Sequence, residues 1–124
     1  MAQPAIKLLE EMEPEVDAAL AIDRNHLARM TYGDRSLERE LLELFDRQAA
    51  ILLARMRTAD AASVAALAHT LRGSALGVGA SRVAQAAAAV EAAGDAAERE
   101  PAVDHLAVSV AGARTCIATL LRAV

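Results

Sequence analysis

The sequence predicts an all-α protein: an antiparallel four-helix bundle with a short extra N-terminal helix. Hydrophobic residues make up 55% of the 124-residue chain but aromatic residues only 2%, so small aliphatic side chains must fill the core. Alanine is abundant, favours helices and lets them approach closely. Apolar residues recur at steps of three and four, without the alternation typical of strands. A chain of this length is expected to form one domain.

Charge and cysteine content argue against several classes of function. The net charge of −4, with no basic cluster among aromatic residues, argues against nucleic-acid binding. No uncharged apolar run approaches the ~18 residues that cross a bilayer, and the acidic N-terminus lacks the core of a signal peptide. The single cysteine, Cys116, cannot form an internal disulfide and is predicted to pack in the core. We therefore expect a cytoplasmic protein without membrane contact.

Capping residues divide the first half of the chain. Residues 1–22 are predicted to form an N-terminal segment, partly helical or flexible, and residues 23–124 the bundle domain. Asp23 is predicted to cap a short helix that ends at Met30, and Asp34 to cap a helix that ends near Thr58. The second of these carries a wide apolar stripe, which suits a helix with two neighbours: Leu37, Leu41, Leu44, Phe45, Ile51, Leu52 and Met56.

Three more helices are expected in the second half. The first begins after Asp60 or Ser63 and ends near Gly77 or Gly79. The next is capped by Ser81 and ends near Ala93, with Gly94 as its C-terminal glycine and residues 94–100 as a loop. Pro101 is expected in the first turn of the last helix. Its apolar spacing fits either a homodimeric coiled coil or the fourth wall of a monomeric bundle, and we favour the bundle.

Residues 68–80 carry the most informative pattern in the chain. On a helical wheel, His69 lies opposite the apolar positions Val64, Leu67, Ala68, Leu71, Ala75 and Val78, so its ring is expected to face solvent. Arg72 and Gly73 follow one turn later on the same side. An imidazole titrates near pH ~6.5 and is largely neutral and nucleophilic at cytoplasmic pH. No histidine has a partner at metal-ligand spacing, so no metal site is expected.

This stretch closely resembles the signature of histidine-containing phosphotransfer (HPt) domains. His69, Leu71, Arg72, Gly73 and Ser74 match its successive positions, and Gly79-Ala80 matches its ending. The upstream residues 40–45 also resemble the second helix of the family, and the resemblance covers roughly residues 20 to 122. It implies that His69 accepts a phosphoryl group, on the Nε2 atom of its ring, from the aspartate of a response-regulator receiver domain and passes it to another receiver.

The resemblance also implies roles for the residues around His69. Arg72 would neutralise phosphate charge, and Gly73 would leave access for the partner. Apolar residues would form the centre of the docking surface: Ala65, Ala66 and Leu76. The family often has a glutamine on the following helix that bonds to the imidazole. The aligned residue here is Glu91, and Gln85 is a second candidate for this orienting role.

The predicted function is that of a monomeric phosphocarrier in a two-component phosphorelay. Its partners would be receiver domains and a hybrid or sensor histidine kinase. No ATP site or cofactor of its own is expected, because the receiver would supply Mg²⁺ and catalysis. The alternative is a non-catalytic helical adaptor that binds receiver or kinase domains. Such an adaptor has no need of the cation and glycine that follow His69.

Overall fold

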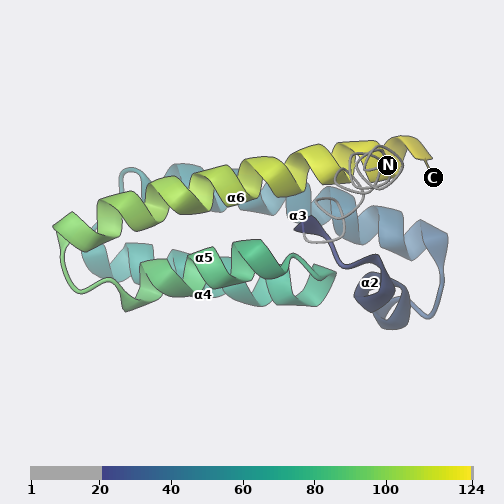
Figure 1. The fold of residues 1–124 in the computed structure, drawn as a ribbon, viewed down its shortest axis with the longest axis horizontal. Coiled ribbons are helices and arrows are strands. Elements are labelled where there is room, and N and C mark those ends of the chain that lie inside the picture. Colours follow the sequence, from purple (N-terminus) through teal and green to yellow (C-terminus); the bar gives the residue numbers. More distant parts are fainter. Residues whose placement is uncertain (1–20, 124) are drawn as a thin grey trace, which may run out of the picture.

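The computed structural model describes residues 21–123, and the helices in this range are shown in Figure 1. Most of residues 1–22, the predicted N-terminal segment, lies outside the described residues. The all-α prediction is confirmed: the described residues form five helices and no strand. These are α2 (Arg24–Met30), α3 (Arg35–Met56), α4 (Ala61–Val78), α5 (Ser81–Ala92) and α6 (Ala96–Ala123).

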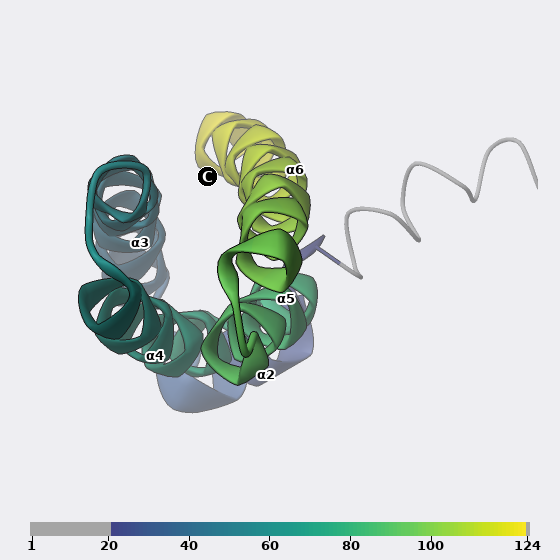
Figure 2. The same ribbon diagram turned by 90° about the vertical axis from the view of Figure 1, so that its left-hand side faces the viewer.

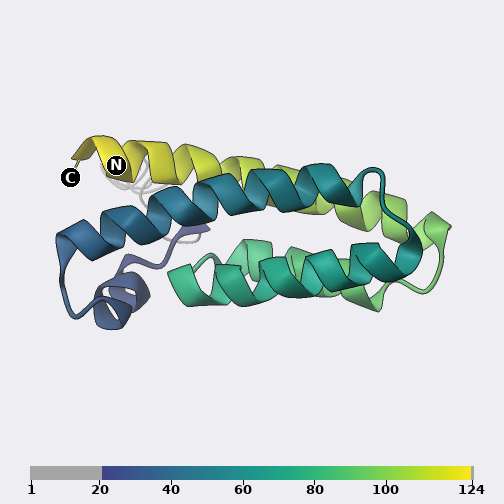
Figure 3. The same cartoon turned by 180° about the vertical axis from the view of Figure 1, so that it is seen from behind.

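The four longer helices surround one core. Seen end-on in Figure 2, α3, α4, α5 and α6 follow one another around the bundle, and α3 also contacts α6. The short helix α2 contacts α4 near one end of the bundle, where Figure 3 shows it beside the connection to α3. Within residues 21–123, no helix is both long enough and apolar enough to cross a membrane.

Aspartate side chains begin three of the helices: Asp23 and Asp34 as predicted, and Asp60 as one of the two predicted alternatives. Asp23, Asp34 and Asp60 accept hydrogen bonds from backbone N–H groups three residues later, at 3.1, 3.1 and 2.8 Å. Each bond satisfies a donor that the first helical turn leaves without a partner. The bonds from Ser63 also hold the pKa of the Asp60 carboxyl below its usual value.

The ends of α5 correct two predictions. Ser81 is the first residue of the helix rather than its cap, because Ala80 precedes the helix and offers no capping side chain. Gly94 is not a left-handed C-terminal residue: among the described glycines only Gly33 and Gly79 have positive φ. Instead the chain leaves α5 through an extended Ala93, and the Gly94 N–H donates to Glu98 Oε2 at 2.8 Å.

The last helix begins at Ala96, so the prediction of a loop over residues 94–100 was wrong for its second part. The Asp95 side chain accepts a 2.9 Å hydrogen bond from the Glu98 N–H and so starts the helix earlier than expected. Pro101 lies inside the helix rather than in its first turn. The proline ring fixes φ at a value that is compatible with a helix. Because proline has no backbone N–H, the helix loses one backbone hydrogen bond there.

The core matches most of the expected apolar positions. Seven of the apolar positions named above are buried: Phe45, Met56, Val64, Ala68, Leu71, Ala75 and Val78. Leu41, Leu52 and Leu67 are only partly buried and pack against this core. On α6, Leu106, Val110 and Ile117 are also buried, so its apolar spacing serves the fourth wall of the bundle. Cys116 is buried as predicted, and burial raises the pKa of its thiol.

Part of the predicted stripe on α3 lies outside the core. Leu37, Leu44 and Ile51 are exposed, whereas Leu42 and Ala49 are buried. The exposed residues recur every seven positions and therefore form one row along the helix. The stripe is wider than the face that α3 buries against α4 and α6, so its outer edge remains in solvent.

Candidate functional site

His69 stands on the solvent side of α4 because the opposite side of that helix packs into the core. The buried residues of α4 are Val64, Ala68, Leu71, Ala75 and Val78. The His69 side chain is 66% exposed. The helical wheel therefore placed the ring correctly, and α4 provides a rigid support for it.

Glu91 of α5 meets the imidazole from the neighbouring helix. Its Oε1 atom lies 2.9 Å from His69 Nδ1, and its side chain is only 21% exposed. An ionised carboxylate accepts hydrogen bonds and cannot donate them, so this contact assigns the ring proton to Nδ1. The Nε2 atom then carries the lone pair of the neutral ring.

Arg72 contacts both Glu91 and His69. Its Nη1 atom lies 3.1 Å from Glu91 Oε2, and its Nη2 atom lies 3.3 Å from His69 Nδ1. Nδ1 cannot donate to Glu91 and accept from Arg72 at once, and the shorter contact with the charged acceptor decides in favour of Glu91. The Arg72–Glu91 contact is an ion pair without hydrogen-bond geometry, since the buried Oε2 atom receives no hydrogen bond.

Small and apolar residues of α4 surround the charged group that His69, Arg72 and Glu91 form. Gly73 is exposed, and a Cβ added there would have no neighbour within 4 Å. Leu76 is 56% exposed, Ala66 is exposed and Ala65 is half-buried. The surface around the imidazole thus has open space at Gly73 and an exposed apolar side chain one turn beyond it.

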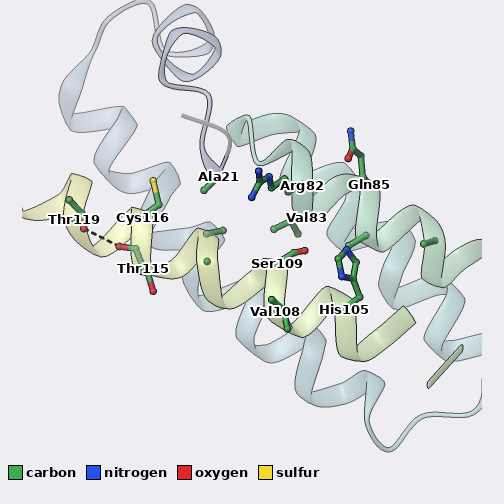
Figure 4. A pocket seen from close by; sticks show the side chains of 14 residues that line it. Ala21, Arg82, Val83, Gln85, His105, Val108, Ser109, Thr115, Cys116 and Thr119 are labelled. Atoms are coloured by element: carbon green, nitrogen blue, oxygen red, sulfur yellow. Dashed lines mark hydrogen bonds between the residues drawn. The ribbon is translucent and has the colours of Figure 1, made fainter. Parts of the chain in front are cut away.

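Gln85, the second candidate for orienting the ring, lies elsewhere on α5. It lines a groove of about 850 Å³ between α5 and α6, together with Arg82 and His105 (Figure 4). Glu91 comes six residues later, which turns its side chain to a different face of the helix. Among the described residues, the structure therefore brings Glu91 to His69 and leaves Gln85 in this groove.

The exposed row on α3 is the surface feature that the sequence analysis missed. Leu44 and Ile51 were assigned to the core because their spacing continues the apolar stripe. The signal that could have found them is the width of the stripe, which exceeds what a helix in a small bundle can bury.

Within residues 21–123, no group of three His, Cys, Asp or Glu side chains is placed to hold a metal ion.

The arrangement offers one kind of chemistry. A neutral imidazole with its Nδ1–H held by a carboxylate presents an exposed Nε2 nucleophile. A guanidinium one turn away on the same helix can stabilise an anion that arrives at this nitrogen. Open space at Gly73 admits a large reaction partner.

Comparison with known protein families identifies one that matches most of the chain. The family model of the Hpt domain matches residues 36–123, which include α4, α5, α6 and all but the first residue of α3. The range contains His69, Arg72 and Glu91. Comparisons with curated proteins and with solved structures find no significant match. Because the match covers most of the chain and contains the exposed histidine, the protein belongs to the Hpt domain family.

Proposed function

We propose that this protein carries phosphoryl groups between receiver domains of a two-component phosphorelay, with His69 as the acceptor. Histidine phosphotransfer is the general role of Hpt domains, which are phosphocarrier modules. The observation that supports His69 most directly is its exposed ring, whose Nδ1 atom is held 2.9 Å from Glu91 Oε1. This contact leaves Nε2 free to react.

In the proposed reaction, His69 Nε2 attacks the phosphorus of a receiver phospho-aspartate. The P–O bond to the aspartate breaks, its electron pair returns to the carboxylate, and an N–P bond forms. Phosphoryl transfer depends mainly on positioning and charge stabilisation. Glu91 orients the ring and Arg72 stabilises the phosphoryl oxygens, while the receiver supplies Mg²⁺ and its own polar residues. The domain needs no ATP site or cofactor of its own.

Docking would use the exposed side of α4. Ala65, Ala66 and Leu76 provide an apolar surface around His69, and Gly73 leaves room for the loops of a receiver. We further propose that the domain acts as a monomer in the cytoplasm, with a hybrid or sensor histidine kinase as the upstream source of the phosphoryl group.

The test is transfer of labelled phosphate from phosphorylated receiver domains to purified variants. His69→Gln should abolish labelling and leave the melting temperature nearly unchanged, because the ring is exposed. His105→Gln, a matched change at an exposed histidine on α6, should be labelled like the wild type. The label should be labile in acid and stable in base, as expected for an N–P bond.

Two results would contradict the proposal. Labelling that survives in His69→Gln would exclude His69 as the acceptor. Binding of receivers by the wild type without any transfer would indicate a non-catalytic adaptor.

A further inference from the structure

We propose that the charge of Glu91 keeps the phosphorylated ring of His69 protonated at Nδ1, which makes the domain a labile phosphoryl donor rather than a stable store. This inference rests on the proposed function, because it requires His69 to carry the phosphoryl group. It goes beyond orientation of the ring, since a neutral hydrogen-bond acceptor could orient the ring equally well.

The protonation state of the product decides how easily the N–P bond breaks. When neutral His69 attacks through Nε2, the ring keeps its Nδ1 proton and becomes a phosphorylated imidazolium. When the phosphoryl group leaves, the electron pair of the N–P bond returns to Nε2 and neutral imidazole is released. If the Nδ1 proton is first lost to water, the leaving group becomes an imidazolate anion, which is a much poorer leaving group. Retention of that proton therefore keeps transfer fast.

Glu91 is placed to retain the proton. Its Oε1 atom already lies 2.9 Å from Nδ1, the atom that bears the proton in the phosphorylated ring. The carboxylate is largely shielded from solvent, so its attraction to a cationic ring is weakened less than that of a surface charge. Val90, the preceding residue, is 2% exposed and fixes this part of α5 in the core.

Arg72 makes the influence of the Glu91 charge on the His69 ring depend on phosphorylation. Among the described residues, the charged groups in contact with the His69 ring are Arg72 on α4 and Glu91 on α5. Before transfer, Glu91 divides its charge between the ring and Arg72, whose Nη1 atom lies 3.1 Å from Oε2. A phosphoryl dianion on Nε2 offers Arg72 a second anionic partner. As Arg72 turns to the phosphoryl oxygens, more of the Glu91 charge acts on the cationic ring.

The experiment compares Glu91→Gln with the wild type after chemical phosphorylation. Both full chains also carry His26→Gln and His105→Gln, so that phosphoramidate can phosphorylate only one histidine. After the donor is removed, loss of phosphohistidine is followed by ³¹P NMR from pH 5.5 to 9, and ¹⁵N NMR reports protonation of Nδ1. The amide introduced by Glu91→Gln keeps an oxygen that can accept from Nδ1–H but has no charge.

We expect hydrolysis to slow as pH rises in both proteins, with a midpoint about one pH unit lower in Glu91→Gln. At pH 8 the variant phosphohistidine should then persist about tenfold longer, and its Nδ1 resonance should titrate at the lower midpoint. Glu91→Asp, which retains the charge, should remain closer to the wild type. Glu100→Gln, the same change at an exposed glutamate on α6, should match the wild type.

Equal midpoints in Glu91→Gln and the wild type would overturn the inference, even if His69 transfers phosphate normally. A midpoint that falls equally in Glu91→Asp and Glu91→Gln would also overturn it, because displacement of the ring rather than charge would then explain the change. By contrast, a chemically phosphorylated His69 that exchanges no phosphate with any receiver would contradict the proposed function while leaving the measured role of Glu91 intact.

Discussion

The backbone N–H of Asp23 donates a 2.8 Å hydrogen bond to the carbonyl of Gly79, and so joins the start of α2 to the end of α4. Gly79 has φ of 79°, and a Cβ added there would lie 2.9 Å from the carbonyl oxygen of Asp23. The glycine thus serves both the left-handed turn and the close approach of a second segment. The short helix α2 is thereby tied to the helix that carries His69.

Gly79→Ala should destabilise the domain by more than the ~1–2 kcal/mol of a left-handed non-glycine residue, because the new Cβ also meets backbone. Gly77→Ala is the matched control, since a Cβ there has no neighbour within 4 Å and the residue lies inside α4. It should stabilise by up to ~1 kcal/mol. Urea unfolding measures both. Equal effects would show that the Asp23 contact does not restrict Gly79.

Substitutions of Gly73 should affect stability and phosphoryl transfer in different ways. Gly73→Ala should stabilise α4 by up to ~1 kcal/mol, because the added methyl group meets nothing and alanine is the better helix former. Gly73→Gln should slow transfer from a phosphorylated receiver, since its side chain stands beside the imidazole. The two variants are compared by thermal melting and by transfer rate. Wild-type transfer by Gly73→Gln would mean that receivers do not dock on this side of α4.

Arg72→Ala should slow transfer by about 10- to 100-fold, the range expected for loss of one charge-assisted hydrogen bond. Its ion pair with Glu91 is partly exposed, so the melting temperature should change little. Arg82→Ala, which removes an exposed arginine from the groove between α5 and α6, is the control. Single-turnover transfer measures the effect, and equal rates for both variants would exclude a role of Arg72 in the reaction.

Leu71→Ala should cost about 2–5 kcal/mol of folding free energy, because the side chain is fully buried and its removal leaves a cavity. Leu76→Ala removes the same atoms from an exposed position and should change stability by less than ~0.5 kcal/mol. Denaturant unfolding compares them. Similar losses at both positions would contradict the assignment of the two faces of α4.

Cys116 should react slowly with iodoacetamide in the native protein and rapidly in denaturant. Burial raises the pKa of its thiol, so less of the reactive thiolate is present at pH 8 than in the unfolded chain. The native state therefore holds the thiol proton more tightly than the unfolded chain does. As a result, the free energy of unfolding falls as pH rises above the unfolded-state pKa and through the folded-state pKa. Alkylation followed by mass spectrometry tests this. Equal rates in both states would show that the thiol is accessible.

The sequence by itself determined the helical class, the caps Asp23 and Asp34, and the solvent-facing side of His69. These features are local: a capping aspartate bonds to a backbone N–H three residues away, and a helix of known period fixes which residues share a face. The motif around His69 likewise lies within one helix, and so it identified the family. Asp95 and Pro101 are both typical of a helix start, and the prediction that used Pro101 placed the start of α6 too late, because Asp95 caps the helix.

Only the tertiary structure decided which residue of α5 meets the imidazole and which part of the α3 stripe is buried. Glu91 and Gln85 lie on one helix, and the choice between them depends on how α5 is rotated and shifted against α4. Likewise Leu44 and Phe45 are adjacent apolar residues, yet only Phe45 is buried, because α4 and α6 cover one side of α3. Helical periodicity specifies angles within one helix, whereas these outcomes depend on packing between helices.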